Sequence, residues 1–444
     1  MTIILPLPLP PQPVPATPMP ESVFALTLVL LLMAPLAIAG VALINAGLGR
    51  SRSAAQALLG NLAIIAVTAV VFAIAGAALA GAVPGTPGSA GHSFQFAGKS
   101  WNWIGSGPSL MSGFSAAPLQ TQLALIFELL SAALAALLPW GSGADRWRLA
   151  AGLTTAAVMA AIVFPLLAHW IWGGGWLAQL GINYSLGAGF LDPGGAATVH
   201  VLGGLSALAV VWIAGPRRGK FPKEGLSTAM PGHNAAYVLF GCLLALAGWL
   251  TWNAAGALLW LHAPLDTLPQ TILNTWLSAA GAILATFTVT RIRFGKPDAS
   301  LCANGWLAGL VTSSACAALV TPGQALFAGF VAGIFTPLLV ELLELALSID
   351  DPSGAIAVHA AAGFWGLFAA GMFAPQKGQL VAQLVGIATL LGLVLPLTYL
   401  LFWLLNRVAP FRVDPDGERI GMDLHELGGG AYPEFVIHRD ESYR

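Results

Sequence analysis

The sequence predicts an all-α polytopic membrane protein, with eleven transmembrane helices arranged as two inverted five-helix repeats and a final helix. The first observation is composition: of 444 residues, 57% are hydrophobic and only 8% are charged, whereas soluble domains carry roughly 25% charged residues. The second is a set of long segments without Asp, Glu, Lys or Arg, among them 24–40, 54–81 and 380–405. The third is a short segment that occurs twice. An apolar helix needs about 20 residues to cross a bilayer, so the lipid bilayer is the predicted surrounding of the chain.

The chain divides into a leader, a transmembrane domain and a tail. Proline-rich residues 1–20 lack the positive start of a secretory signal and are predicted to form an extended leader. The transmembrane domain is predicted to span 21–408, with its first helix beginning near Glu21, and a cytoplasmic tail to follow over 409–444. Apolar runs bounded by Gly, Pro and charged residues place the helices at 22–48, 54–83, 119–139, 148–171, 195–214, 235–261, 268–290, 301–319, 323–347, 355–373 and 380–408.

Basic residues are distributed unequally between the two sides of the predicted helices. Sixteen Lys and Arg residues fall in alternate loops and in the tail, whereas the other side receives only Lys377 and Lys99, the latter in the long external loop 84–118. Cytoplasmic loops carry the excess of Lys and Arg, so the N-terminus is predicted to lie outside and the C-terminus inside. The basic segment 216–224 is interpreted as part of this signal, and no nucleic-acid partner is expected.

The repeated segment reads DPGGAATVHVLGG at 192–204 and DPSGAIAVHAAAG at 351–363. Each copy begins a predicted helix, but the two helices enter the membrane from opposite sides, which makes the two halves inverted repeats. Such repeats place the functional site near the midplane, between the halves. His200 and His359, each about two turns into its helix, are therefore predicted to meet inside the membrane.

An ionisable residue inside a membrane helix marks a pathway or site by default, although a lone His can also hydrogen-bond packed helices together. Neighbouring small residues favour close approach of the two backbones: Gly203, Gly204 and Gly363. A metal or haem site would need further His, Cys or carboxylate ligands, so no metal or cofactor is predicted, and the charged rings or carbonyl filters of ion pores are not visible. Imidazole donates and accepts hydrogen bonds and titrates near neutrality, which favours a narrow pore for a small, weakly basic solute.

These segments resemble motifs of the Amt/Mep/Rh ammonium transporter family, and of the Amt branch in particular, over roughly residues 22–432. TVHVLGG and AVHAAAG are similar to the segments with the family's paired pore histidines. FPLLAHWIWGGGWL at 164–177 is similar to the segment with its outer tryptophan, here Trp172. Further similar segments are GWLTWNAAGALL at 248–259, NGWLAGLV at 304–311 and the tail segment GMDLHELGGGAY at 421–432.

The resemblance implies a role for each matched residue. Trp172 would present its ring to ammonium, a cation–π contact of ~0.5–2 kcal/mol, although Trp also occurs in interfacial belts. Asp192 would support the site as a helix N-cap and not bind the ion itself, as an Asp before Pro at a helix start also indicates, and Asp351 would cap the second helix. His200 and His359 would line a pore in which ammonium is deprotonated and NH3 passes, with or without a separate proton.

The resemblance also implies partners and a location. Ammonium or ammonia would be the substrate, and the chain would form a homotrimer in the inner (cytoplasmic) membrane. A cytoplasmic motif would comprise Asp351 together with Gly421, Asp423 and Tyr432 of the tail, which in the family communicates with PII-type signalling proteins.

Four positions around the predicted recruitment site depart from the family pattern. The two stacked phenylalanines of the family align with Ser131 and Trp252, and its cation-holding serine aligns with Gly256. Glu128 stands where the family has an uncharged glutamine. A buried carboxylate without a partner recruits a cation or becomes protonated. We hypothesise that Glu128 restores the cation affinity lost at the other three positions. The alternatives are a protonated Glu bonded to a neighbouring helix, and a pore with a different selectivity or without its gate.

The sequence therefore predicts transport of ammonium or ammonia through a twin-histidine pore. GxSxG, Walker A, HExxH and CxxC patterns do not occur, so an enzyme is not expected. Two alternatives remain: an ammonium sensor with little conduction, which the altered gate favours, and a passive, Rh-like channel for the neutral gas.

Overall fold

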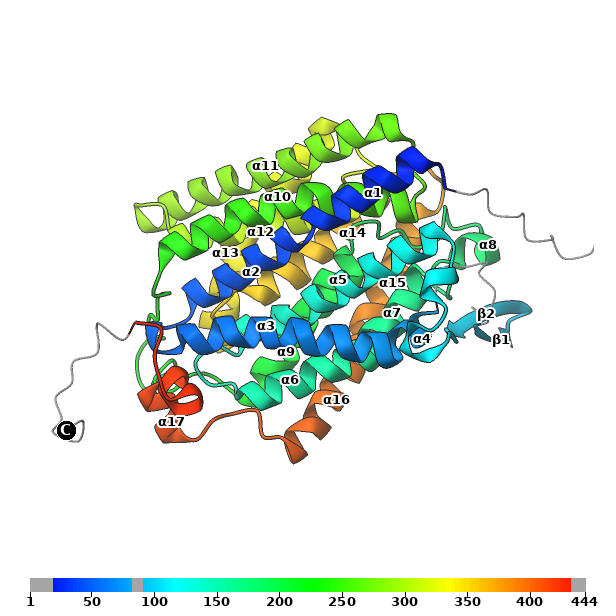
Figure 1. The fold of residues 1–444 in the computed structure, drawn as a ribbon. Coiled ribbons are helices and arrows are strands. Elements are labelled where there is room, and N and C mark those ends of the chain that lie inside the picture. Colours follow the sequence, from blue (N-terminus) through cyan, green and yellow to red (C-terminus); the bar gives the residue numbers. More distant parts are fainter. Residues whose placement is uncertain (1–18, 82–90, 433–444) are drawn as a thin grey trace, which may run out of the picture.

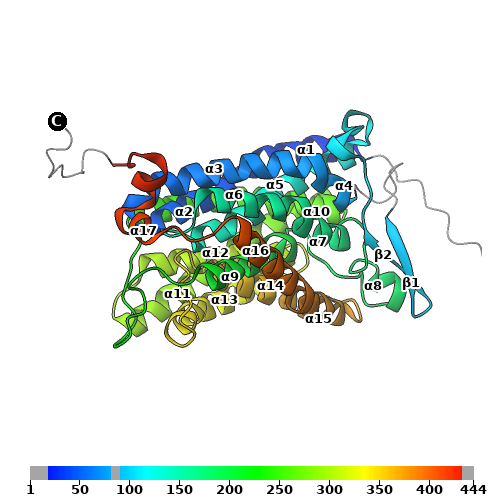
Figure 2. The ribbon, with the colours of Figure 1, turned by 90° about the horizontal axis from the view of Figure 1, so that it is seen from below.

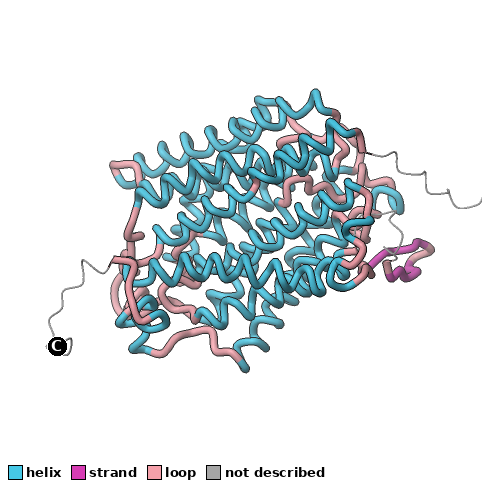
Figure 3. Tube along the Cα trace, viewed as in Figure 1, coloured by secondary structure: helices cyan, strands magenta, loops and turns pink. Residues whose placement is uncertain are grey.

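The structure is a computed structural model that describes residues 19–81 and 91–432. Long helices run side by side through one bundle (Figures 1 and 3). The first helix begins at Glu21, as predicted. The predicted leader, apart from Met19 and Pro20, and the end of the predicted tail from 433 to 444 lie outside the described residues.

Among the described residues, ten helices are long and apolar enough to cross a membrane, which confirms an all-α polytopic membrane protein. The remaining predicted segment, 301–319, is also helical, as α12 (Ala299–Cys316), but it does not count among the ten. It buries a set of polar residues within the bundle: Asn304, Thr312, Ser313 and Ser314. The predicted orientation of the chain stays a prediction.

The first five predicted spans all appear as helices, and three of them include a π-helical turn. They comprise α1 (Glu21–Met33) with α2 (Pro35–Leu48); α3 (Ala54–Val71), a π-turn (Phe72–Gly76) and α4 (Ala77–Ala80); α5 (Leu119–Ser142); α6 (Leu149–Val158), a π-turn (Met159–Val163) and α7 (Phe164–Ile171); and a π-turn (Ala196–Val201) with α9 (Leu202–Ala214). Two boundaries differ from the prediction. The second span ends at Ala80 because Gly81 adopts a φ of +66°, and α5 continues past Pro139 to Ser142.

The second half of the chain repeats the pattern. It comprises α10 (Ala235–Trp260), α11 (Leu268–Phe294), α12, α13 (Pro322–Leu345), a π-turn (Ile356–Ala361) with α14 (Ala362–Phe373), and α15 (Gln379–Thr389), a π-turn (Leu390–Val394) and α16 (Leu395–Val408). The two histidine-bearing segments occupy the same place in each half, each beginning with a π-turn.

The two ends of the bundle carry different short elements. At one end, β1 (His92–Phe96) and β2 (Lys99–Ile104) form an antiparallel hairpin, with α8 (Leu180–Tyr184) nearby (Figure 2); we call this end the hairpin face. At the other end lies α17 (Pro415–Ile420), followed by a π-turn (Asp423–Leu427) (Figure 1); we call this end the tail face. The hairpin is an addition to the prediction, which treated 84–118 as a loop. Ala97 and Gly98, both with positive φ, close it in the manner of a two-residue turn.

Small residues bring neighbouring helices into close contact. A Cβ on Gly40 of α2 would lie 2.5 Å from the backbone nitrogen of Ala245 in α10, and a Cβ on Gly333 of α13 would collide with the carbonyl of Ala282 in α11. Lipid is as apolar as the side chains, so helices in a membrane associate largely through packing of this kind.

Candidate functional site

The two predicted histidines meet in the interior of the bundle. Their rings stack with centroids 5.3 Å apart and an angle of 23° between the planes, and both residues are buried. The indole of Trp249 in α10 also stacks on His200, with centroids 5.1 Å apart and an angle of 15°. His200 therefore has a ring partner in the other repeat and another in α10.

Polar atoms of this pair are free of protein partners. Within the described part of the chain, neither ring nitrogen of His200 accepts or donates a hydrogen bond, and the same holds for Nδ1 of His359. Buried polar groups are nearly always hydrogen-bonded, because an unmade bond costs free energy. These nitrogens are therefore available to a small solute that passes the pair.

A left-handed glycine begins each histidine segment. Gly195 has a φ of +80° and Gly354 a φ of +68°, at the same offset in the two copies, and glycine adopts this conformation without steric cost. The N–H of His200 then donates to the carbonyl of Gly195, five residues back, at 3.1 Å. This wider turn is a π-bulge, a feature that occurs frequently at functional sites.

Aspartates hold both segments as N-caps do. Asp192 Oδ2 accepts from the backbone N–H groups of Ala197 and Thr198, at 3.0 and 2.9 Å. Asp351 Oδ2 accepts from the N–H of Ile356 at 2.8 Å, while its Oδ1 accepts from the hydroxyl of Ser142 at 2.7 Å. Burial raises the pKa of the Asp192 carboxyl to about 6, although the hydrogen bonds from Thr198 and Ala197 oppose the shift.

Glycine allows the two repeats to touch. A Cβ on Gly204 would collide with the backbone nitrogen of Ala360, and a Cβ on Gly363 would lie 2.7 Å from Cγ2 of Val201. The third predicted glycine, Gly203, instead faces Leu138 of α5. Two of the three glycines therefore serve the contact between repeats.

We expect Gly204→Ala to lower the thermal unfolding midpoint in detergent. The new methyl group has no room against Ala360, and overpacking a buried site costs ~1–3 kcal/mol. Gly392→Ala is the matched control, because nothing lies within 4 Å of a Cβ at that helical glycine. Equal midpoints for the two variants would contradict this reading of the contact between repeats.

An aromatic cluster lies beside the start of the His200 segment. Trp172 and Trp260 stack in parallel, with centroids 5.0 Å apart and an angle of 1°. The ring centroid of Phe127 in α5 lies 5.5 Å from that of Trp172 and 5.2 Å from that of Trp252. The structure thus brings two predicted recruitment residues, Trp172 and Trp252, to the same phenylalanine.

The same cluster explains one departure from the family pattern. The indole N–H of Trp172 donates to the carbonyl of Asp192 at 2.8 Å, and that of Trp252 donates to the carbonyl of Gly194 at 3.2 Å. A Cβ on Gly256 would collide with the carbonyl of Pro193. Backbone therefore fills the space that a serine side chain would need at position 256.

The other two departures share one face of α5. Glu128 and Ser131 are both buried, and Oε2 of Glu128 and Oγ of Ser131 have no hydrogen-bond partner among the described residues. Ser131 lies eleven residues, about three turns, before Ser142, which donates to Asp351. The face of α5 that carries Glu128 and Ser131 is therefore the one that, about three turns further on, contacts the start of the His359 segment through Ser142.

The predicted tail residues lie at the tail face and away from the histidines. Asp423 accepts from the backbone N–H groups of Ala55 and Gln56, at 3.1 and 2.7 Å, and so caps α3. Gly421 has a φ of +105°, and the Tyr432 hydroxyl lies 3.0 Å from Nε2 of His233. Asp351, which was predicted both to belong to this motif and to cap the second helix, caps the His359 segment: its carboxylate accepts hydrogen bonds from Ser142, Ser353 and Ile356.

A cavity of about 590 Å³ opens at the tail face. Its lining includes Asp351, Gly354 and Asn304 together with Arg217 and Lys220. The cavity thus reaches the beginning of the segment that carries His359.

Sequence reasoning missed three residues of the site: Trp249, Phe127 and Trp260. A signal was present for Trp249, because it lies in the middle of α10 and not at a helix end, where interfacial tryptophans gather. Phe127 directly precedes Glu128, but its contacts with three tryptophans from other helices leave no trace in the local sequence.

Known proteins resemble this chain over nearly its whole length. A sequence model of the Ammonium Transporter Family matches residues 23–432. The ammonium transporter Amt2 of Archaeoglobus fulgidus is 33% identical over 91% of this chain and 86% of its own length. A solved structure of a sensor Amt protein superposes with a TM-score of 0.81 and 27% identity, over 91% of this chain and 98% of that one. Mep2 of Candida albicans superposes with a TM-score of 0.75 and 23% identity, over 94% and 91%.

The family match covers the helices, both histidine segments and the tail motif, and it agrees with the fold of the solved structures. The chain belongs to the ammonium transporter family.

Proposed function

We propose that this protein transports ammonium or ammonia across the membrane, through a pore that passes His200 and His359. The observation that carries the proposal is the buried, stacked histidine pair, whose ring nitrogens include three without partners among the described residues. Neutral imidazoles can hydrogen-bond a small amine without holding a permanent charge in hydrocarbon.

The hairpin face supplies the features that a cation needs before it loses a proton. Ring faces of Trp172 and Trp252 attract a cation, and the Asp192 carboxylate adds negative charge behind them. We call the site formed by Trp172, Trp252 and Asp192 the vestibule. Ammonium gives up its proton on leaving the vestibule, NH3 passes the two imidazoles, and the proton either follows along the histidine pair or stays outside.

A second candidate function is ammonium sensing with little conduction. It is favoured by the altered positions Ser131, Trp252 and Gly256, and by the 27% identity to a sensor Amt protein. A third candidate, a passive channel for the neutral gas, differs from the first in carrying no charge.

For assembly and location we propose a homotrimer in the cytoplasmic membrane, with a PII-type protein as a partner of the tail face. Large apolar side chains exposed on α10 and α11 fit lipid or a second subunit: Phe240, Leu243, Trp276 and Phe287.

The test of transport is flux in proteoliposomes. Purified protein is reconstituted, an ammonium gradient is applied, and internal pH is followed with a trapped dye beside protein-free vesicles. Transport predicts a pH change well above that of the empty vesicles. Saturable ammonium binding without such flux would establish the sensor instead.

Transport should also depend on pH through Asp192. With a pKa of about 6, this carboxyl is ionised at pH 7 and becomes protonated as external pH falls through about 6, so its attraction for the cation is lost below that value. We expect the half-saturation concentration for ammonium to rise as pH falls from 7 to 5. Asp192→Asn should lack this inflection and bind ammonium weakly at both values; an unchanged profile in the variant would assign the inflection to another group.

A further inference from the structure

On the hairpin side, two glutamines of α15 hold the backbone that leads into the His200 segment. Gln383 accepts from the N–H of Leu191 and donates to its carbonyl, both at 2.9 Å. Gln379 accepts from the N–H of Ala188 at 3.0 Å and donates to the carbonyl of Gly189 at 2.7 Å. Both glutamines are fully buried. A side-chain amide that engages one residue through both its oxygen and its nitrogen fixes that residue in position.

The clamped residue adjoins the vestibule. Leu191 directly precedes Asp192, whose carboxylate caps the His200 segment and whose carbonyl accepts the indole N–H of Trp172. A shift of Leu191 therefore moves the cap and the ring together. Gln383 lies 192 residues further along the chain, in α15.

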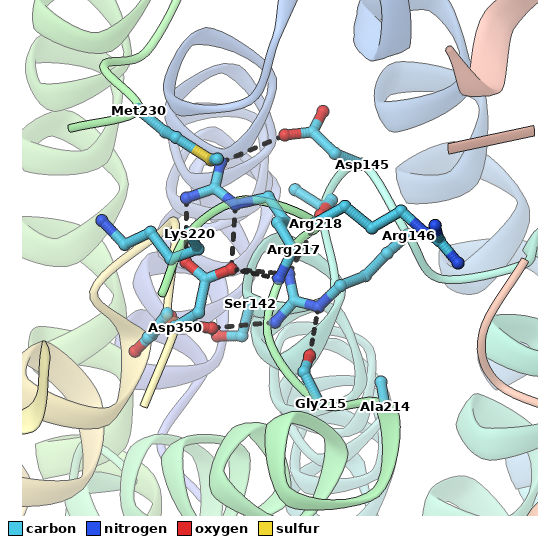
Figure 4. Close-up of polar contacts among 12 residues, drawn as sticks. Ser142, Asp145, Arg146, Ala214, Gly215, Arg217, Arg218, Lys220, Met230 and Asp350 are labelled. Carbon is cyan, nitrogen blue, oxygen red and sulfur yellow. Dashed lines mark hydrogen bonds and ion pairs between the residues drawn. The ribbon is translucent and has the colours of Figure 1, made fainter. Parts of the chain in front are cut away.

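On the tail side, two arginines hold the equivalent residue of the other repeat (Figure 4). Arg217 donates through Nε to Oδ2 of Asp350 at 3.0 Å and through Nη2 to Oδ1 at 2.9 Å. Arg146 donates through Nη2 to the backbone carbonyl of Asp350 at 2.8 Å. Forked pairs between arginine and carboxylate fix geometry as well as charge.

The arginines are held in turn by the surrounding chain. Arg217 also donates to Asp145 at 3.1 Å, and Arg146 donates through Nε to the carbonyl of Gly215 at 2.7 Å (Figure 4). Asp145, Arg146, Arg217 and Asp350 are at most 4% exposed. Burial alone would raise the pKa of Asp350, but the nearby Arg146 and Arg217 more than offset it and hold that pKa below its usual value. The carboxylate therefore stays ionised and paired at neutral pH.

Leu191 and Asp350 occupy the same position in the repeat, one residue before the capping aspartate and nine before the histidine. We propose that Gln383 on one side and the Arg146–Arg217 pair on the other are matched positioning clamps, each setting the place of one pore histidine. The hairpin-side clamp governs binding of the cation, because it fixes Trp172 and Asp192. The tail-side clamp governs the passage step, because it fixes Asp351 and, through it, His359.

The hairpin-side clamp is a neutral amide and the tail-side clamp is an ion pair, and each suits its position relative to the histidines. The neutral amide of Gln383 leaves the charge beside the vestibule to Asp192, so it neither repels nor traps a cation there. The ionic clamp lies beyond the histidines, where it adjoins the tail-face cavity. Gln383 and Arg217 hold Leu191 and Asp350, each nine residues before a pore histidine, so both act through backbone position.

The test rests on the proposed function and compares Gln383→Met with Arg217→Lys in the proteoliposome assay. Gln383→Met keeps volume and removes both hydrogen bonds, and Arg217→Lys keeps the charge and loses the fork. Gln383→Met should raise the half-saturation concentration roughly fivefold or more and leave the maximal rate nearly unchanged. Arg217→Lys should lower the maximal rate by a similar factor and leave half-saturation nearly unchanged.

Two controls separate positioning from folding. Thr389→Val removes a hydroxyl of α15 that donates to the carbonyl of Val385 in its own helix, and Arg407→Lys changes an arginine that lies over the ring of Trp403. Both variants should match wild type. If both clamp variants, folded and reconstituted equally, match wild type or change both parameters alike, the proposal is overturned. A wild type without flux would refute transport and not the clamps. In that case ammonium binding by calorimetry decides: weakened binding in Gln383→Met but not in Arg217→Lys supports the clamps, and any other pattern refutes them.

Discussion

Replacing His200 or His359 with alanine is expected to lower ammonium flux by about ten- to a hundredfold. His200 offers two ring nitrogens and His359 one that have no hydrogen-bond partner among the described residues, and both residues are buried. Removing one partner of a buried hydrogen bond leaves the other polar group unpaired and costs about 1–3 kcal/mol, and each 1.4 kcal/mol is about a factor of ten in rate. Flux is measured as the initial change in internal pH after an ammonium gradient is applied, per mole of reconstituted protein.

His262→Ala is the control for both variants, because this exposed histidine lies at the end of α10, outside the pair. It should keep wild-type flux. The stack of His200 on Trp249 also contributes to packing, so the thermal midpoint of each variant must accompany its flux. If His200→Ala protein is folded and its flux is undiminished, the solute does not depend on the histidine pair for its passage, and the prediction is wrong.

Replacing Glu128 with glutamine is expected to raise the half-saturation concentration for ammonium by about tenfold and to leave the thermal midpoint unchanged or higher. The side chain is 2% exposed and its Oε2 has no partner within the described residues. On the hypothesis that it is ionised when ammonium is bound, its charge favours a cation nearby and costs stability in the empty protein. Loss of that charge therefore weakens binding while it relieves burial. Binding is measured by calorimetry and half-saturation by flux.

Glu21→Gln serves as the control, because Glu21 is exposed at the start of α1. It should change neither quantity. The alternative, in which Glu128 is protonated and only hydrogen-bonds a neighbouring helix, makes a different prediction for Glu128→Gln: unchanged affinity, since glutamine keeps the shape and a donor. The pair of measurements therefore distinguishes a cation site from a structural side chain.

The transmembrane helices and the histidine pair could be predicted because their signals are local or repeated. Apolar runs mark each span, and the repeated segment places His200 and His359 at equivalent positions in the two halves. The role of Gly204 between the repeats also follows from this logic. Helix ends are harder to predict. The second span ends at Ala80 because Gly81 adopts a positive φ, and no polar residue next to Ala80 marks this end in the sequence.

Contacts between distant segments could not be predicted. From the sequence, Gly256 is interpreted as the loss of a serine hydroxyl. In the structure, the carbonyl of Pro193 occupies the space that a side chain at position 256 would need. From the sequence, Arg217 is interpreted as part of the charge bias that orients the chain in the membrane. In the structure it is buried and donates two hydrogen bonds to the carboxylate of Asp350, 133 residues away. Both meanings depend on which backbone lies opposite the side chain, and tertiary packing alone decides that.

The central claim, that ammonium crosses this protein past a pair of histidines, is tested most directly by the current after an ammonium jump. Wild type and His200→Ala are recorded side by side on proteoliposomes of equal protein content. The account predicts an inward positive current in wild type, or, for neutral passage, a rapid internal pH change without current, and the loss of either signal in His200→Ala. Equal signals from wild type and variant, or ammonium binding with neither current nor pH change, would contradict it.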